Sequence, residues 1–351
     1  MSNVLRKLIS IDLGFGHVKA VNEDGRTLTF PSVYNKLTKK ALFGAVEDYV
    51  LDIVEDKNGE VAKRSFNVGC ASQVEGAERR WDDKTSEFNQ EQLEIYITTA
   101  IAGLVGKPGA YEIDLLLGLP ISYFLSKQDS LKQALKGKKF KVFLNNSKAE
   151  YGITLKTVTV QPQGVGALNN ELFNLTGNVK NQELHKDAVF LIDIGHRTVD
   201  YLYMKTLPSG KRINVATLTG SAEELGMNKS YQKIRDRILD ETGFQVTEAD
   251  LEWVALNPEK GYKMILRGQE IDLSNIFKEE YISHAKAISD RIKKLLDVEE
   301  QNVQHFLITG GGAMPLYEYM EDEFHGMRKC DECKFANARG YMALRNATIK
   351  K

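Results

Sequence analysis

Short apolar runs alternate with segments in which apolar residues recur at helical spacing. Apolar runs predict strands over residues 8–12, 113–119, 188–193 and 303–309. Helical spacing predicts helices over residues 93–104, 165–175, 225–238, 281–295 and 335–351. The run 113–119 is nearly continuously apolar, which is typical of a strand covered on both faces. Strands that alternate with helices predict an α/β architecture.

One segment recurs in the two halves of the chain. A strand ends at Asp12, a Leu-Gly turn follows, and a second strand starts at Val18. In the same way, a strand ends at Asp193, an Ile-Gly turn follows, and a second strand starts at Val199. Each copy predicts a β-hairpin with an aspartate at its tip. The repeat indicates that the two halves are duplicated.

The length of the chain also favours two domains. A chain of 351 residues exceeds the roughly 100–200 residues of an ordinary domain. We predict a first domain over residues 1–161, completed by a C-terminal helix over 335–351, and a second domain over 162–334. The mixed and charged pattern of residues 27–88 predicts a small subdomain inserted after the first hairpin.

Composition and charge exclude several classes of protein. Hydrophobic residues make up 42% of the chain and charged residues 27%, which is the profile of a folded protein. The formal net charge is -1, so no overall attraction draws the chain to DNA, RNA or an anionic membrane. We therefore expect neither direct nucleic-acid binding nor membrane binding.

The apolar runs and the cysteines predict a cytoplasmic protein. No run approaches the roughly 18–20 apolar residues of a membrane span, and the N-terminus lacks the pattern of a signal peptide. The chain has three cysteines, too few for a disulfide framework. Cys330 and Cys333 form a C-x-x-C without a second pair, and we expect solvent-exposed free thiols there.

The two hairpin turns carry the candidate chemistry. A carboxylate at a strand end, followed by glycine in a tight turn, surrounds a concavity with backbone amides that suit phosphate oxygens. Single Asp-x-Gly turns are common, but two copies that open separate halves indicate a phosphate clamp. The candidate phosphate-binding residues are Gly14, Phe15, Gly16, His17 and Lys19 in the first loop, and Gly195, His196, Arg197 and Thr198 in the second.

A cation must separate the two aspartates from a polyphosphate. Mg²⁺ keeps its waters in such sites, and Asp12 and Asp193 are predicted to hold it through water. Lys19 adds an ammonium near the phosphates. The bulky His17 and His196 have the alternative role of turn residues, and the guanidinium of Arg197 has the alternative role of a direct phosphate ligand.

These motifs together resemble a known superfamily. The segments at 12–19, 161–167, 193–200, 220–226 and 310–312 resemble, in order, those of actins, heat-shock chaperones and sugar kinases. Segments 160–163, 225–226 and 337–341 resemble bacterial plasmid-partition ATPases of the ParM type. The resemblance implies an α/β, actin-like (ribonuclease H-like) fold, with two similar domains flanking a cleft for ATP or GTP.

The resemblance also implies roles for single residues. Gln163 takes the position that orients the attacking water, so Gln163, Asp12 and Asp193 are the predicted catalytic residues. An amide can position a water but is not a strong base, which suits slow phosphoryl transfer to water. Gln163 has an alternative role as a cap of the following helix. Gly226, Gly311 and Gly312 are implied nucleotide contacts, although the glycine run has the alternative of a flexible turn.

The predicted function is an ATPase that polymerises on binding ATP and disassembles after hydrolysis, segregating plasmid DNA through an adaptor protein. Its partners would be further copies of itself and a DNA-binding adaptor. Two rivals remain on this fold: a small-molecule (sugar-type) kinase and a cell-shape or division scaffold. A chaperone ATPase is a weaker rival, because we expect no substrate-binding domain after residue 351.

Overall fold

The computed structural model describes residues 4–37, 49–57, 60–69 and 89–350. The chain divides into two compact units, which we call unit 1 (Met1–Asn181 with Phe335–Lys351) and unit 2 (Gln182–Lys334). The boundary lies after residue 181 rather than after the expected 161, because helix α4 (Val165–Leu172) packs on helix α10 (Ala336–Ile349) of unit 1. None of the helices in the described ranges is long and apolar enough to cross a membrane.

Within its described residues, unit 1 forms one nine-stranded sheet and four helices. In sheet order, the strands are β3 (Thr27–Pro31), β2 (His17–Asn22), β1 (Leu5–Leu13), β7 (Gly109–Leu119), β9 (Tyr151–Pro162), β8 (Lys139–Leu144), β5 (Tyr49–Lys57), β6 (Glu60–Val68) and β4 (Tyr34–Lys36). The helices are α2 (Gln90–Val105), α3 (Ile121–Leu135), α4 and α10.

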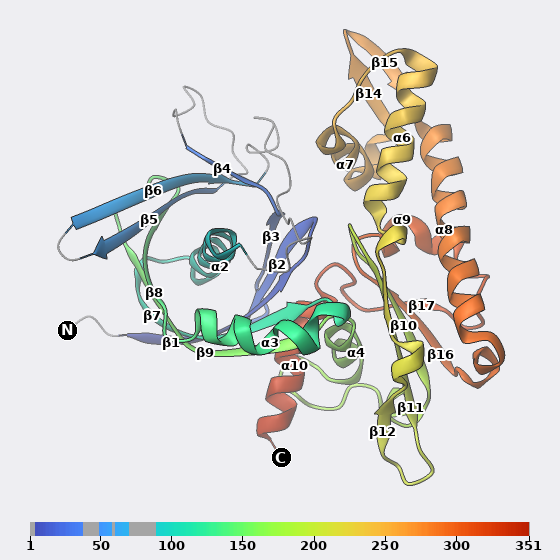
Figure 1. Ribbon diagram of the computed structural model, residues 1–351, viewed down its shortest axis with the longest axis horizontal. Helices are drawn as coiled ribbons and strands as arrows, with labels where there is room; N and C mark the ends of the chain where they lie inside the picture. The colour runs from blue at the N-terminus through green and yellow to red at the C-terminus, as the bar shows by residue number, and fades with distance from the viewer. Residues whose placement is uncertain (1–3, 38–48, 58–59, 70–88, 351) are drawn as a thin grey trace. The chain divides into compact units, whose positions relative to one another are not determined.

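The sheet of unit 1 curves around α2, which Figure 1 shows nearly end-on within the strands. Nearly every residue of α2 is buried, and Gly106 ends the helix in the left-handed conformation. Strands β5 and β6 from the predicted subdomain at 27–88 join this same sheet through β8. The rest of that predicted subdomain, at 38–48, 58–59 and 70–88, lies outside the described residues.

The side chains of β1 point alternately to the two faces of the sheet. Ile9 and Ile11 belong to the large core that includes α2. Leu8 belongs to a second cluster with Tyr341 and Met342 of α10. Side chains two residues apart point to the same face of a strand, so Asp12 lies on the α10 side of the sheet together with Leu8. The period of this one strand therefore sets the face on which the first aspartate lies.

Helices α4 and α10 cross at two glycines. A Cβ on Gly340 would lie 1.6 Å from the carbonyl oxygen of Gly166, and a Cβ on Gly166 would lie 2.3 Å from the Tyr341 ring. Neither side chain could be added without moving the helices apart. The Tyr341 ring also fills the space beside Gly118 of β7. Three glycines thus allow α10 to lie directly on β7 and α4.

Unit 2 contains two sheets, of six and two strands. Its strands are β10 (Val189–Ile194), β11 (Val199–Thr206), β12 (Arg212–Asn214), β13 (Gly220–Ala222), β14 (Lys263–Leu266), β15 (Gln269–Asp272), β16 (His305–Thr309) and β17 (Arg328–Lys329). Its helices are α5 (Gln182–Lys186), α6 (Met227–Thr242), α7 (Glu248–Leu256), α8 (Ser274–Leu296) and α9 (Ala313–Leu316). Short 3₁₀ turns are formed by Ala216–Leu218, Glu223–Leu225, Pro258–Lys260, Asp297–Asn302 and Tyr317–Tyr319.

The repeated segment forms the same substructure in each unit. Strands β1 and β2 form an antiparallel hairpin, and β1 also pairs in parallel with β7. Strands β10 and β11 form the second hairpin, and β10 pairs in parallel with β16. Both predicted hairpins are confirmed, with Asp12 and Asp193 each one residue before the end of its strand.

The other predicted elements differ from the structure mainly at their ends. Helix α4 stops at Leu172 rather than 175, because Phe173 turns extended and bridges to Val179. Helix α8 begins at Ser274, well before the predicted 281. Cys330 and Cys333 are free, as expected, but the expectation of solvent exposure was wrong, since both are buried. The Cys333 thiol donates to the carbonyl of Cys330, which favours the buried position.

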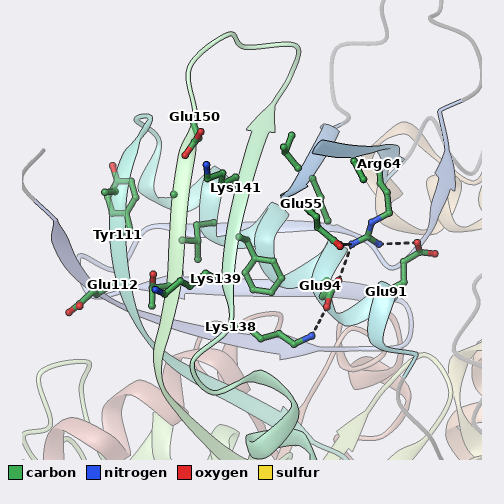
Figure 2. A pocket seen from close by; sticks show the side chains of 18 of the residues that line it. Glu55, Arg64, Glu91, Glu94, Tyr111, Glu112, Lys138, Lys139, Lys141 and Glu150 are labelled. Carbon is green, nitrogen blue, oxygen red and sulfur yellow. Dashed lines mark hydrogen bonds and ion pairs between the residues drawn. The ribbon is translucent and has the colours of Figure 1, made fainter. Parts of the chain in front are cut away.

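An open cavity of about 1100 Å³ lies in unit 1 between α2 and strands β5, β8 and β9. A network of charged side chains lines this cavity (Figure 2). The Arg64 guanidinium pairs with Glu55, Glu91 and Glu94. Glu94 also pairs with the Lys138 ammonium. Because Arg64 pairs with carboxylates from both α2 and β5, and Lys138 pairs with Glu94 of α2, we interpret this cavity as a structural network that joins α2 to the sheet.

This network predicts an acid-sensitive contribution to stability. Burial opposes ionisation of Glu94, but hydrogen bonds from Lys138, Gln90 and Arg64 and the charge of Lys138 outweigh it, so the pKa of Glu94 lies below its ordinary value. A carboxyl with a lowered pKa stabilises the fold above its unfolded pKa, and the contribution is lost as pH falls through the folded pKa. We expect Glu94→Gln to lower the free energy of unfolding by about 1–3 kcal/mol at pH 7, measured by urea unfolding.

The same measurement at pH 3 to 5 checks the sign. The difference between Glu94→Gln and the unmodified chain should shrink as pH falls below about 4.5, the ordinary pKa of glutamate. Glu112→Gln is the matched control, since Glu112 lines the same cavity but pairs with Lys156 in the open, and should cost less than about 1 kcal/mol. Equal losses for both variants, or a loss independent of pH, would contradict this assignment.

Candidate functional site

In unit 1, Asp12 is the centre of a buried polar group. The side chain is 3% exposed, and its Oδ1 accepts a hydrogen bond of 2.7 Å from Nε2 of Gln163. Its Oδ2 lies 3.7 Å from Nζ of Lys19, which stands opposite Asp12 in the hairpin register. Two distant segments of the sequence thus meet at one carboxylate, and the predicted site residues Asp12, Lys19 and Gln163 lie together.

The backbone holds Gln163 at the end of β9. Its N–H donates to the carbonyl of Leu119, at the end of the neighbouring strand β7. Parallel strands end at the same edge of a sheet, which is where ligands bind in α/β folds. The alternative role of Gln163 as a helix cap is taken by Asn337, which accepts from the N–H groups of Gly164 and Ala167 at the start of α4. The Gln163 side chain points to Asp12 instead.

Ser32 holds the first loop, residues 14–17, through two hydrogen bonds. The Ser32 hydroxyl donates to the carbonyl of Gly14 and its N–H donates to the carbonyl of Gly16. A Cβ on Gly14 would lie 2.7 Å from the carbonyl oxygen of His17, so a side chain does not fit in this turn. Phe15 and His17 are each partly exposed at the turn. With its carbonyls held by Ser32, the loop is fixed in one conformation.

The second loop closes on itself in unit 2. The N–H of Gly195 donates to the carbonyl of Thr198 at 2.8 Å, and Thr198 is buried. Asp193, also buried, stands opposite Asp200 in the hairpin register. The second hairpin therefore places a carboxylate where the first has Lys19. The two hairpins share a backbone arrangement, but the residue opposite the aspartate is Lys19 in the first and Asp200 in the second.

The start of helix α6 docks on the second loop. The N–H groups of Met227 and Asn228 donate to the carbonyls of Gly195 and His196. A Cβ on Gly226 would lie 2.1 Å from the carbonyl carbon of Arg197, so only glycine permits this approach. The implied nucleotide contact Gly226 thus lies directly against the loop of residues 195–198.

The glycine run completes the same cluster. Gly310 has a left-handed φ of +89°, and a Cβ there would lie 2.4 Å from Oδ1 of Asp193. The N–H of Gly312 donates to the carbonyl of Ile194. Gly311 has no heavy atom within 4 Å of its Cβ position and is exposed. Asp193, the second loop, Gly226 and the glycine run therefore lie together in unit 2.

His196 is held by its neighbours. Its Nε2 lies 3.0 Å from a carboxylate oxygen of Glu248 at the start of α7, and its ring lies 6.4 Å from that of Tyr231 in α6. This arrangement fits the alternative that His196 is a turn residue. Arg197 is partly exposed in the same turn, with its own interactions, and keeps both of its candidate roles.

The donor set around Asp12 fits magnesium held through water. Gln163 and Lys19 already face the two carboxylate oxygens, but an ionised carboxylate has about four acceptor positions. A metal-bound water can donate to the remaining positions without displacing either neighbour. In the described ranges, no group of three or more His, Cys, Asp or Glu side chains forms a cluster that could hold a metal ion alone. A cation there would need ligands from water or phosphate.

Sequence reasoning missed two buried supports of these loops. Burial lowers the pKa of His284 in α8, so the ring is neutral at pH 7, and its Nε2 lies 3.0 Å from the carbonyl of Leu225 just before α6. Asn337 in α10 accepts from the N–H groups of Gly164 and Ala167. An asparagine at the start of a predicted helix was the one available signal for the second, since asparagine is a common cap.

Comparison with known families agrees with this geometry. The family described as "Actin like proteins N terminal domain" matches residues 10–166, and the family "Archaeal actin homologue MreB-like, C-terminal" matches residues 191–322. The two matches together cover most of the chain, which belongs to the actin-like proteins. The predicted actin-like α/β fold is thereby confirmed.

Individual relatives extend over nearly the whole chain. This chain is 24% identical over 352 residues to an archaeal actin homologue of Thermoplasma volcanium, and the match covers 95% of this chain and 97% of that protein. A 15-stranded ParM filament from Clostridium botulinum gives a TM-score of 0.77 at 22% identity, covering 97% and 98% of the two chains. The structure of an archaeal actin homologue in complex with ADP gives a TM-score of 0.73 at 22% identity, covering 98% of this chain and 100% of that chain. The predicted likeness to ParM-type actins is confirmed.

The glycine run yields a stability prediction. We expect Gly310→Ala to lower the free energy of unfolding by about 2–4 kcal/mol, because it adds a Cβ at a left-handed φ and against Asp193. Gly311→Ala is the matched control, since open space surrounds that position, and should change stability by less than about 1 kcal/mol. Thermal and urea unfolding of the two variants provide the measurement. Equal destabilisation would show that the run is not held against Asp193.

Proposed function

We propose that this chain is an actin-like ATPase that polymerises when it binds ATP and disassembles after hydrolysis. Asp12 and Asp193 would hold Mg²⁺ through water, and loops 14–17 and 195–198 would bind the phosphates, with contacts from Gly226, Gly311 and Gly312. The filament would act in the cytoplasm and move plasmid DNA through an adaptor protein. The ADP-bound and filament-forming proteins among the similar structures support the nucleotide and the polymer.

The hydrogen bond between Asp12 and Gln163 carries this proposal. An ionised carboxylate only accepts hydrogen bonds, so the Gln163 amide must present Nε2 to Asp12. Its oxygen, Oε1, can then accept a hydrogen bond from a water molecule. Buried contacts hold both side chains, so that water would be oriented by groups fixed before the reaction. Fixed orientation is what hydrolysis of a phosphoanhydride chiefly requires from protein groups.

Charge near the phosphates would come from several sources. When bound, Mg²⁺ would neutralise part of the polyphosphate charge and help stabilise the transferring group. Lys19 stands beside Asp12 and can place its ammonium toward a phosphate that lies across the first loop. The backbone of the second loop adds N–H dipoles in unit 2. No residue here needs to act as a strong base, which fits slow turnover.

Polymerisation would follow from the nucleotide state. ATP favours one arrangement of an actin-like subunit, and a lattice that selects this arrangement is weakened when hydrolysis removes a phosphate. Head-to-tail contacts do not close into a ring and so extend into filaments. A net charge of -1 gives the chain no general affinity for DNA, and this supports an adaptor between filament and plasmid.

Light scattering recorded together with phosphate release tests the filament. We expect scattering to rise when ATP and Mg²⁺ are added and to decay as phosphate accumulates, because hydrolysis weakens the lattice. ADP should produce no rise. Production of ADP that requires an added sugar, without phosphate release or scattering, would overturn the filament proposal in favour of a sugar-type kinase. Stable scattering on lipid vesicles alone would favour a cell-shape or division scaffold.

Gln163→Ala tests the catalytic step. We expect kcat for ATP hydrolysis to fall roughly 10- to 100-fold while nucleotide affinity changes little, since the amide acts on the water rather than on the nucleotide. Filaments should consequently persist longer.

Gln161→Ala is the matched control for that variant. Gln161 is also buried, but its amide donates to the carbonyl of Tyr341 rather than to Asp12. It should keep the hydrolysis rate of the unmodified chain. If the Gln163→Ala variant hydrolyses ATP as fast as the unmodified chain, Gln163 has no part in the mechanism.

A further inference from the structure

Helix α10 begins where the chain returns to unit 1. The chain leaves unit 2 at Lys334, and α10 starts at Ala336. Asn337, in the first turn of α10, is buried, with 7% of its surface exposed. A buried amide must find hydrogen-bond partners, and those of Asn337 lie 170 residues or more away in the sequence. The location of these partners indicates what the residue does.

Asn337 caps a helix to which it does not belong. Helix α4 begins after Gly164, which has no side chain that could cap it. The Oδ1 atom of Asn337 accepts from the N–H of Gly164 at 2.9 Å and from that of Ala167 at 3.1 Å. A cap normally comes from the residue at the helix start and accepts from the third helical N–H, here that of Ala167. Helix α10 therefore supplies the acceptor that α4 lacks.

The capped residue follows Gln163 directly. Gln163 is held on one side by the carbonyl of Leu119 and on the other by the bond from Gly164 to Asn337. Gly164 has a φ of +76°, which few residues other than glycine adopt, so the turn depends on outside support. Removal of the acceptor would free the turn to rotate. The Gln163 amide would then lose its fixed distance to Asp12.

The same turn of α10 also contacts the strand of Asp12. The Ser10 hydroxyl donates to the carbonyl of Ala338 at 2.6 Å, and both residues are buried. Ser10 and Asp12 lie two residues apart on one face of β1. The first turn of α10 thus fixes both partners of the Asp12–Gln163 hydrogen bond, one through Ser10 and the other through Asn337.

We propose that Asn337 is a positioning residue for hydrolysis, which acts by holding the turn that carries Gln163. This inference rests on the proposed ATPase function and adds a residue to it. Both hydrogen bonds that Oδ1 of Asn337 accepts come from the start of α4. Its loss should therefore slow the chemical step without weakening the binding of nucleotide.

Asn337→Ala and Asn337→Asp test this role. We expect Asn337→Ala to lower kcat roughly 10- to 100-fold with KM for ATP unchanged, because the water-orienting amide is displaced. Asn337→Asp keeps an acceptor at the N-terminus of α4, where a negative charge is favourable, and should restore most of kcat. If the alanine variant melts below the assay temperature, Asn337→Ser, which keeps a shorter acceptor, should give an intermediate kcat.

Asn346→Ala is the matched structural control. Asn346 lies in the same helix, and its amide donates to the carbonyl of Leu175 in the loop after α4. Its loss removes one bond between α10 and that region without touching the turn at 163–164. We expect a lower melting temperature and an unchanged kcat. A loss of kcat equal to that of Asn337→Ala would show that α10 acts only through general stability.

A double variant separates positioning from other effects. If Asn337 acts through Gln163, adding Asn337→Ala to Gln163→Ala should lower kcat no further than Gln163→Ala alone. Multiplied losses, or normal kcat in Asn337→Ala, would overturn the positioning role while leaving the ATPase function intact. An unmodified chain that releases no phosphate from ATP would overturn both proposals together.

Discussion

The close crossing of α4 and α10 is the constraint on which the arrangement of unit 1 depends. Gly340 and Gly166 bring two backbones into direct contact, and no side chain fits between them. This close approach of α4 and α10 lets the Asn337 amide reach the start of α4 and lets Tyr341 pack beside β7. The end of the chain thereby becomes part of the structure around Asp12, although more than 300 residues separate them.

The two halves repeat a backbone while dividing the chemistry. Both hairpins carry an aspartate near the end of a buried strand, next to a parallel neighbour. The first adds a cation opposite that aspartate, at Lys19, and an amide at Gln163. The second has Asp200 opposite its aspartate, and surrounds it with backbone from α6 and the glycine run. Unit 1 therefore holds the groups suited to orienting water, and unit 2 those suited to holding phosphate.

Local pattern was sufficient to predict the hairpins, most helices and the α/β fold. The aspartates and glycines of the two loops were predicted because they repeat, and Gln163 because of its family position. Asn337 was missed because its role depends on a partner across the fold, which no local spacing encodes. Helix α3 was missed because its apolar face is narrow, with only Leu131 and Leu135 buried. The burial of the two cysteines likewise depends on tertiary packing.

Calorimetric titration of ATP with Mg²⁺ tests the central claim most directly, using the unmodified chain, Asp12→Ala and Asp193→Ala. The account predicts one site per chain, and a loss of affinity of roughly tenfold or more in each variant, since both loops would serve one nucleotide. An unrelated surface aspartate, Asp129, provides the control as Asp129→Ala, because its side chain is 80% exposed on α3. Unchanged affinity in either loop variant, or two independent sites per chain, would contradict the account.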